Sequence, residues 1–239
     1  MQEDKRASLP ARHELKYLIN PGELEVLRRR LRPMLHLDPH CRGPESSYGI
    51  RSLYLDDIAN TAYFDKQAGV LHRDKYRIRI YNNSDEIIFL ERKRKDGDLI
   101  QKSSVRISRT LAERIIAGNC AGLERIEAPL LQELYREMRL HLLRPRVIVE
   151  YAREAYVHPA ENVRITFDLH VHSGLFSRDL FDPALPTVPA LPDGRAVLEV
   201  KFDRALPPFI STLLHGISAE RSAVSKYVLC RQFEPLDEF

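Results

Sequence analysis

The sequence predicts an α+β fold built on one antiparallel sheet of about eight strands, with helices at its edges. Short segments in which apolar and charged residues alternate recur along the chain, as expected for strands with one buried face. Turn signals join several of these segments directly, which favours antiparallel pairing. Helix-start signals and apolar residues at helical spacing lie between other segments, so the helices are expected outside the sheet.

The first half of the chain alternates strands with two helices. Asn20 precedes Pro21, a pair typical of an N-cap followed by the first helical residue. Asp96-Gly97 is a strong hairpin signal between two strand patterns. The expected strands are 12–19, 48–56, 71–82, 87–95 and 99–108, the expected helices are 21–32 and 59–68, and 33–46 is expected to be a loop.

The second half begins with helices and returns to strands. Thr110 and Glu113 form a capping-box pattern at the start of a helix. Prolines at every third position from Pro183 to Pro192 indicate an extended surface loop. A further helix is expected at 129–142, strands at 146–156, 163–171 and 196–203, and terminal helices at 208–215 and 219–232. We expect a flexible N-terminus at 1–11, a single domain at 12–232 and a tail at 233–239.

Composition narrows the class of protein. The chain has 239 residues, of which 44% are hydrophobic and 30% charged, which excludes a disordered tail and a coiled-coil rod. No apolar run approaches the roughly 18 residues that span a bilayer, and the N-terminus lacks the apolar region of a secretory signal. We therefore expect no membrane segment and a cytoplasmic location. The net charge of +3 is too small to indicate a nucleic-acid binder by itself.

Charged residues repeat on one face of strand after strand. Alternate residues of a strand share a face, so Lys75, Arg77 and Arg79 lie together, as do Glu199 and Lys201. For any one strand, an ordinary polar face in water is the better explanation. Across many strands, arginines and lysines interrupted by single carboxylates suit a polyanion held with Mn²⁺ or Mg²⁺. If the sheet closes with this face inside, roughly eight strands enclose room for an extended ligand.

Six short segments, in this order, carry a resemblance to a known family. They are RHELKY at 12–17, SLYLDD at 52–57, KYRIRIY at 75–81, LERKRK at 90–95, LEVKF at 198–202 and SKY at 225–227. Together they resemble the VTC (vacuolar transporter chaperone) polyphosphate polymerase domain, which belongs to the triphosphate tunnel metalloenzyme (CYTH-like) superfamily. The resemblance runs from about residue 12 to residue 232, nearly the whole chain.

The resemblance implies an eight-stranded antiparallel β-barrel tunnel, with helices packed outside and a C-terminal helix at one mouth. It implies ATP and inorganic polyphosphate or pyrophosphate as ligands, with Mn²⁺ or Mg²⁺ as cofactor and Glu199 as the principal metal ligand. The other carboxylates considered as metal ligands are Glu14, Glu150 and Glu91. The residues expected to act in catalysis are Lys16, Arg77, Arg79, Lys93, Arg146, Lys201 and Lys226. The further residues expected to bind substrate are Lys75, Lys102, Arg106, Arg164 and Ser225.

One departure bears on the activity. Hydrolytic members of the superfamily carry glutamate-x-glutamate-x-lysine on the first strand, whereas this chain has Arg12 before Glu14 and Lys16. The expectation is therefore a polyphosphate polymerase that transfers the ATP γ-phosphate to a growing chain. A triphosphatase acting on tripolyphosphate, nucleotides or RNA 5′ ends is the first alternative, and a noncatalytic polyphosphate or nucleic-acid binding module is the second. The interleaved glutamates argue against nucleic acid, since each repels a backbone phosphate.

Other chemistries find less support in the sequence. Neither a Walker-type phosphate loop nor a dinucleotide-binding glycine fingerprint is present. Asp168, His170 and His172 share a strand parity that suits a metal or phosphate, although polar residues at a tunnel mouth are the simpler interpretation. The three cysteines lack metal-ligand spacing.

Overall fold

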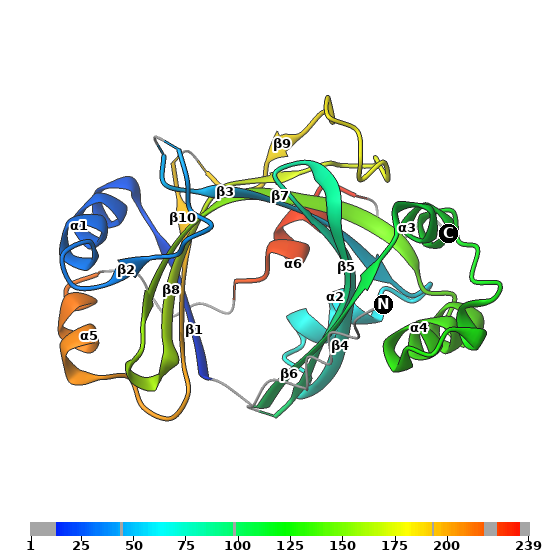
Figure 1. Cartoon of the computed structure of the whole chain (residues 1–239), viewed down its shortest axis with the longest axis horizontal. Helices are drawn as coiled ribbons and strands as arrows, with labels where there is room; N and C mark the ends of the chain where they lie inside the picture. Colours follow the sequence, from blue (N-terminus) through cyan, green and yellow to red (C-terminus); the bar gives the residue numbers. More distant parts are fainter. Residues whose placement is uncertain (1–12, 44, 98, 193, 218–223, 235–239) are drawn as a thin grey trace.

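A computed structural model shows a strongly curved antiparallel sheet of ten strands, flanked by helices (Figure 1). The structure describes residues 13–43, 45–97, 99–192, 194–217 and 224–234. The expected α+β tunnel class is confirmed, since eight long strands follow one another in antiparallel pairs around a concave face. In sheet order they are β1 (His13–Ile19), β10 (Ala196–Phe202), β8 (Val163–Ser173), β7 (Arg144–His158), β3 (Tyr48–Asp56), β4 (His72–Tyr81), β5 (Ser84–Asp96) and β6 (Leu99–Ile107).

Two short strands extend this sheet. β2 (His36–Leu37) pairs with β7, and β9 (Val188–Pro189) pairs with β8. The first lies in the segment expected to be a loop, and the second lies in the proline-containing segment. The helices are α1 (Pro21–Leu31), α2 (Thr61–Gln67), α3 (Arg109–Ile116), α4 (Pro129–Leu140), α5 (Pro208–Leu213) and α6 (Lys226–Arg231), and the 3₁₀ turns are η1 (Leu123–Arg125) and η2 (Ala160–Asn162).

Apolar residues on the convex face of the sheet pack against two pairs of helices, which bury that face. Leu198 and Val200 of β10 pack in one core with Leu24 and Leu27 of α1. The other convex core lies around α3 and α4, at the β4 to β6 side of the sheet. Figure 1 shows α1 and α5 outside one arm of the curve and α3 and α4 outside the other. The alternate side chains of each strand therefore point to the concave face.

A third core lies on the concave face, beneath α2 and α6. Val147 and Val149 of β7 pack there with Tyr63 of α2 and with Tyr227 and Cys230 of α6. These two helices fill part of the hollow rather than covering the outside (Figure 1). The rest of the concave face is polar and is lined by charged side chains.

The helix ends show where local signals succeed and fail. Asn20 caps α1 as expected, and Asn20 and Glu23 exchange side-chain and backbone hydrogen bonds at 2.9 Å. The expected capping box at Thr110 is wrong, because Ser108 caps α3 and Glu113 forms an ion pair with Arg109 instead.

The ends of the chain are described only in part. The expected terminal helix at 219–232 is observed at Lys226–Arg231, while 218–223 lie outside the described residues. Residues 1–12 and 235–239 also lie outside them, so the expected flexible N-terminus and most of the expected tail are not described. In the part of the chain that is described, no helix has the length and apolarity needed to cross a bilayer.

Candidate functional site

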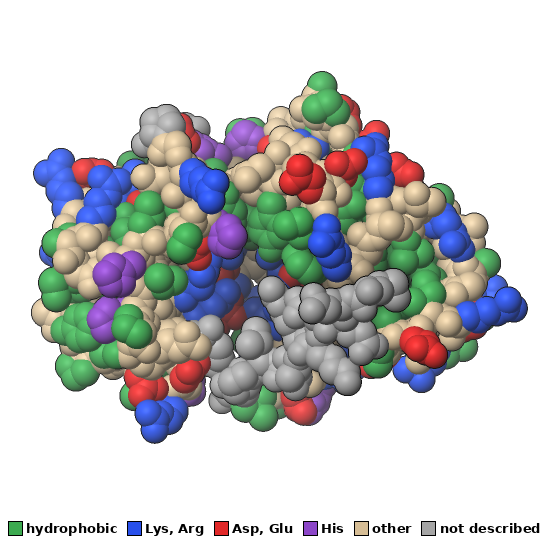
Figure 2. All heavy atoms as spheres, in the orientation of Figure 1, with side chains coloured by type: hydrophobic (Ala, Val, Ile, Leu, Met, Phe, Trp, Pro, Cys, Tyr) green, Lys and Arg blue, Asp and Glu red, His purple; other side chains and the backbone are tan. Residues whose placement is uncertain are grey.

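Charged side chains from seven strands and α6 converge on the concave face. In β4, Arg77 and Arg79 point to this face, while Ile78 between them lies in the convex core. The same alternation places the charged residues of β1, β5, β6, β8 and β10 opposite their apolar neighbours. Figure 2 shows Lys, Arg and acidic side chains deep in the central hollow of the molecule. The hollow therefore has an ionic lining, unlike the apolar interior of a small barrel that only packs side chains.

Glu199 and Glu14 form the centre of the site, on the paired strands β10 and β1. Lys16 Nζ lies 3.3 Å from Glu14 Oε1 and 3.4 Å from Glu199 Oε1. Lys201 Nζ lies 3.2 Å from Glu199 Oε2 and 3.8 Å from Glu14 Oε1. Lys93 of β5 reaches Glu14 Oε2 at 2.5 Å. Because β1 and β5 belong to opposite arms of the sheet, this last ion pair spans the hollow.

Lys226 of α6 joins this centre to a second ion pair. Its Nζ lies 2.8 Å from Glu199 Oε1, contacts Asp168 and sits 5.0 Å from the centre of the Tyr151 ring. Arg153 of β7 donates to both oxygens of Asp168 at 2.6 and 2.8 Å, and its Nη2 lies 3.6 Å from Glu199 Oε2. Glu199 is thus surrounded by cations from three strands and one helix.

Glu91 of β5 organises the third part of the lining. Arg77 contacts it through Nε at 2.7 Å and Nη2 at 2.6 Å, and Arg79 Nη1 lies 3.7 Å away. Lys102 of β6 contacts the other carboxylate oxygen. Arg77 Nη1 also donates to the Tyr54 hydroxyl at 2.9 Å. These contacts hold two guanidinium planes toward the hollow, in a geometry that suits phosphate oxygens.

The protonation states follow from this mixture of burial and charge. Burial opposes ionisation of Glu199, yet Lys16, Lys226 and Lys201 hold the pKa of this carboxyl well below its usual range. Burial likewise opposes ionisation of Glu91, but Arg77 and Arg79 lower its pKa strongly. The carboxylates are therefore anions at neutral pH and poor proton acceptors.

The pKa values of the tunnel lysines shift in both directions. Burial lowers the pKa of Lys226, but Asp168 and Glu199 outweigh it and raise that pKa above its usual value. Burial, together with the charge of Lys16, lowers the pKa of Lys93 to about 8. Burial lowers the pKa of Lys102 to about 8 despite the charge of Glu91. An incoming anion would favour the charged form of both.

The donor set of the centre fits Mg²⁺ or Mn²⁺. These ions take carboxylate oxygens, and Mg²⁺ is commonly held by one or two carboxylates, several waters and substrate phosphates. Glu199 and Glu14 supply such oxygens. Thr166, paired with Glu199 across β8 and β10, contributes a buried hydroxyl oxygen that has no hydrogen-bond partner among the described residues. The described residues include no cluster of three or more His, Cys, Asp or Glu side chains placed to hold a metal alone, so a bound ion would need phosphate or water to complete its shell.

The start of α6 brings Ser225 to the hollow, and Asp56 holds the helix in place. Ser225 precedes the helix, and its hydroxyl accepts a hydrogen bond from Lys75 Nζ at 3.1 Å. Asp56 accepts from the Tyr227 hydroxyl and from the backbone amides of Ala62 and Tyr63 in α2. One buried carboxylate thus ties α2 and α6 to the end of β3.

The structure brings together most of the residues that the sequence singled out. Those whose side chains meet on the concave face are Lys16, Arg77, Arg79, Lys93, Lys201, Lys226, Lys75, Lys102, Ser225, Glu199, Glu14 and Glu91. Two others lie away from the centre. Arg164 pairs with Asp38 at 2.6 Å, and Arg106 is exposed and donates to the Glu86 carbonyl at 2.7 Å.

The expectation that Glu150 and Arg146 share this face is wrong. Glu150 pairs at 2.5 Å with Arg51, whose guanidinium also donates to the carbonyls of Leu180 and Asp182. Arg146 donates to the Asp57 carbonyl at 3.0 Å. Glu150 shares its parity with Ile148, which lies in the convex core, whereas Val147, Val149 and Tyr151 face α6. Arg146 is the extra residue of a bulge where β7 pairs with β3, so the strict alternation does not hold there.

Sequence reasoning missed Arg153 and placed Asp168 only among alternatives. Arg153 shares its parity with Val147, Val149 and Tyr151, which belong to the apolar core under α6. Because most residues on this face of β7 are apolar, the alternation of residue types does not indicate that the face also carries a functional charge. The other two members of the Asp168 alternative separate in space, since His172 contacts Thr187 at 2.9 Å and His170 is exposed at a left-handed bulge.

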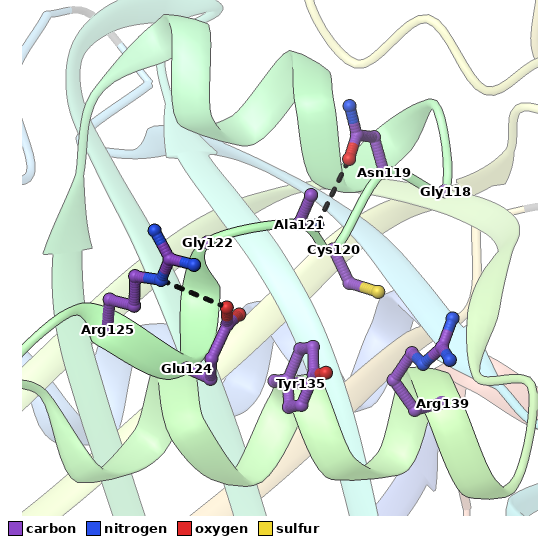
Figure 3. Close-up of a pocket in the computed structure, with 9 residues that line it drawn as sticks. All are labelled: Gly118, Asn119, Cys120, Ala121, Gly122, Glu124, Arg125, Tyr135 and Arg139. Carbon is purple, nitrogen blue, oxygen red and sulfur yellow. Dashed lines mark hydrogen bonds and ion pairs between the residues drawn. The ribbon is translucent and has the colours of Figure 1, made fainter.

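A cavity of about 670 Å³ lies elsewhere, between the C-terminal end of α3, η1 and α4 (Figure 3). Its charged lining consists of Arg125, Arg139 and Glu124, and Arg125 is already 3.5 Å from Glu124. The cavity is on the outer side of the sheet and contains none of the cations of the hollow. The ionic centre at Glu199 is therefore the better candidate for chemistry on phosphates.

The comparisons with known proteins agree with this geometry. A family model described as VTC domain matches residues 11–233. The chain belongs to the VTC domain family. Among solved structures, this VTC domain is similar to a candidate adenylyl cyclase from Hippeastrum that is described as having a dominant triphosphatase activity. The two chains are 16% identical with a TM-score of 0.57, and the similarity covers 95% of this chain and 100% of that chain.

A candidate adenylate cyclase from Bacillus halodurans is also similar, with 11% identity, a TM-score of 0.50, and 86% of each chain covered. This VTC domain thus shares its fold with these two proteins, and we call its hollow the tunnel. No curated protein matches the chain.

Proposed function

We propose that this VTC domain is a metal-dependent polyphosphate polymerase. In the proposed reaction, an oxygen of the terminal phosphate of an inorganic polyphosphate chain forms a bond to the γ-phosphorus of ATP. The bond from that phosphorus to the bridging oxygen breaks, and ADP leaves with the electron pair. The chain grows by one phosphate, and no proton has to be removed from the acceptor at neutral pH.

The observation that supports transfer to phosphate is the state of the tunnel carboxylates. Glu14, Glu91, Glu199 and Asp168 each contact at least two cations. Those cations lower the pKa of every one of the four carboxyls, against the effect of burial. A carboxylate of this kind is a weak base for the proton that an attacking water must lose. A phosphate acceptor has no such proton to lose at neutral pH, so the lining favours transfer over hydrolysis.

The cations have two roles in this proposal. Arg77, Arg79, Lys93 and Lys226 would bind the ATP triphosphate and stabilise the charge that develops on the transferred phosphoryl group. Glu199 and Glu14 would hold Mn²⁺ or Mg²⁺, which when bound neutralises phosphate oxygens. The ion pairs already hold these side chains toward the tunnel, so little reorganisation is needed at the moment of transfer.

The direct test is product analysis with a matched variant. Purified protein is incubated with ATP, Mn²⁺ and pyrophosphate, and the products are separated by size while orthophosphate is measured in parallel. We expect chains longer than the primer, and we expect Glu199→Gln to lose metal-dependent turnover while keeping its circular dichroism spectrum. Glu25→Gln is the control, since Glu25 lies on the exposed side of α1 and its ion-pair partner among the described residues is Arg29 of the same helix. Unchanged metal-dependent turnover in Glu199→Gln contradicts the assignment.

A triphosphatase is the second candidate, because the structurally similar Hippeastrum protein is described as having a dominant triphosphatase activity. The same tunnel would then bind tripolyphosphate, a nucleotide or an RNA 5′-triphosphate, with water as the acceptor. Release of orthophosphate from ATP without chain elongation, in the assay above, would establish this candidate in place of the polymerase.

A further inference from the structure

Three large apolar side chains are exposed where β3 leaves the sheet and where α4 ends. Leu140 is 73% exposed, Leu142 46% and Ile58 38%. The Ile58 amide donates to the His141 carbonyl at 3.4 Å, so the turn after β3 contacts the turn after α4. Leu143, the next residue, is buried in the convex core. Exposed apolar residues that adjoin one another mark interaction sites more often than single ones do.

The backbone of this turn is strained at one of the exposed leucines. Leu142 has φ 54°, in the left-handed region. It follows the α4 cap His141, at the position where glycine is usual and a bulky side chain is unfavourable. The Leu143 amide closes the turn by donating to the Glu137 carbonyl at 3.2 Å. An unfavourable backbone conformation that carries an exposed apolar side chain points to a use for that side chain.

The cavity between α3 and α4 adjoins these residues through Arg139. Tyr135 and Arg139 lie four residues apart on one face of α4 and line the cavity, with Cys120 on the other side (Figure 3). Arg125 also lines it, and the acid in the lining, Glu124, lies 3.5 Å from Arg125. A concave site of about 670 Å³ has room for several side chains of a bound segment.

The arginines at this end of α4 lack acidic partners. In the part of the chain that the structure describes, neither Arg139 nor Arg144 forms an ion pair, and Arg144 Nε donates to the Leu142 carbonyl at 3.4 Å. An acidic ligand can therefore form charge-assisted hydrogen bonds with them without breaking an existing pair. What we call the α4 surface consists of Ile58, Tyr135, Arg139, Leu140, Leu142 and Arg144.

We propose that the α4 surface binds a segment of a partner protein in which acidic residues adjoin large apolar ones. The acidic residues pair with Arg139 and Arg144. The apolar residues pack on Leu140, Leu142 and Ile58, and one of them enters the cavity. The α4 surface lies outside the tunnel and contains none of its cations, so the inference does not depend on the proposed function.

The charges argue against two other occupants. A second copy of this chain that met the first through the same surface would place Arg139 and Arg144 of one copy against those of the other. An anionic bilayer would meet Glu124 and the exposed Glu127, and a flat lipid surface does not enter a concave site. A protein segment can place acids beside the arginines and apolar side chains in the cavity.

Peptide selection on the whole protein tests the inference. A phage-displayed library of random peptides is selected against the purified protein, and affinities of the enriched peptides are measured by fluorescence anisotropy. We expect these peptides to combine aspartate or glutamate with leucine or phenylalanine. Arg139→Glu/Leu142→Asn should weaken their binding at least about tenfold, the size of one charge-assisted contact. Asparagine tolerates the left-handed backbone, so this variant should keep its circular dichroism spectrum.

A second variant and a control separate binding from folding. Arg139→Glu/Leu140→Gln leaves the strained position untouched and should weaken binding to a similar extent. The control is Met34→Asn/Arg42→Glu, which changes one exposed apolar residue and one exposed arginine in the segment that follows α1. Its affinity for the peptides should stay within about twofold of the parent protein.

The tunnel cations also attract acidic peptides, but such binding would survive both α4 variants. Unchanged affinity in both variants therefore overturns the inference, as does enrichment of peptides without acids or no enrichment at all. Loss of binding to phosphatidylserine vesicles, or of self-association in sedimentation, in the same variants would also overturn it, because the surface would then belong to a bilayer or a second copy. ATP turnover by the α4 variants should match the parent protein, so failure of this inference and failure of the proposed function are separate results.

Discussion

Affinity for a triphosphate should fall as pH rises above about 8, because two lysines of the tunnel lose their protons there. Burial and neighbouring cations lower the pKa of Lys93 and of Lys102 to about 8 in the free protein. Lys93 faces Glu14, Lys16 and Lys201, whereas Lys102 faces Glu91 and the two arginines of β4. Bound phosphate oxygens favour the charged form of both, so binding takes up protons above that pH.

The size of the effect follows from the protonated fractions. Between pH 8 and pH 9 the charged fraction of each lysine falls from about one-half to about one-tenth, which weakens binding by about fivefold for each. For both lysines together the decrease is about thirtyfold. This value is an upper limit, because the side chains are 37% and 40% exposed and water screens their charges. Below pH 7 the affinity should change little through these groups.

Calorimetry with tripolyphosphate in EDTA at pH 7, 8 and 9 measures the dependence without turnover. Lys93→Arg/Lys102→Arg is the matched variant, since a guanidinium keeps its charge throughout this range. The ligand titrates equally in both experiments, so the difference between the two profiles isolates the lysines. We expect the arginine variant to lose less affinity above pH 8 than the parent protein. Parallel profiles would refute the assignment of depressed pKa values to these two positions.

Two predictions concern stability. Arg28 of α1 contacts the fully buried Glu154 through Nε and Nη2, each at 2.7 Å. Arg28→Ala should therefore lower the free energy of unfolding, measured in urea, by about 3 kcal/mol. The control Arg29→Ala, at an exposed position, should lower it by less than about 0.5 kcal/mol. A similar small loss in both would show that Glu154 does not depend on its partner. Tyr227→Phe removes one donor from Asp56 and should cost about 1 to 2 kcal/mol, and a wild-type midpoint in urea would contradict the anchoring of α6.

The charged faces were predictable wherever the strand was regular. In β4, Arg77 and Arg79 alternate with Ile78, and the pairing with β5 is continuous up to Arg79, so parity alone gives the correct face. In β7 the same reasoning fails, because the residues that face α6 are mostly apolar or aromatic and the parity that contains Glu150 faces the convex side. Arg146 fails for another reason. It is the extra residue of a bulge against β3, and a bulge has no reliable signature in a single sequence.

The position of α6 also depends on contacts that no local pattern contains. Lys226 reaches Glu199 because Tyr227 is hydrogen-bonded to Asp56 and stacks on Tyr54, with ring centres 5.2 Å apart. These partners lie about 170 positions earlier in the chain. Periodicity predicts a helix at the C-terminal end, but only the packing of β3, α2 and α6 places that helix inside the curve of the sheet. The resemblance to the VTC family supplied what the local pattern could not.

The carboxylates of the tunnel both hold its cations in position and compete with phosphate for them. Where Glu14, Glu91 and Glu199 are present, each cation is already held in position by a carboxylate, and a phosphate must exchange with that ion pair. Such exchange limits the net gain from binding but keeps the cations preorganised for transfer. Among the described residues Lys75 contacts a hydroxyl and an aromatic ring rather than a carboxylate, so a phosphate bound there would displace no ion pair. In the proposed reaction, we therefore expect transfer itself to depend on the preorganised cations around Glu199.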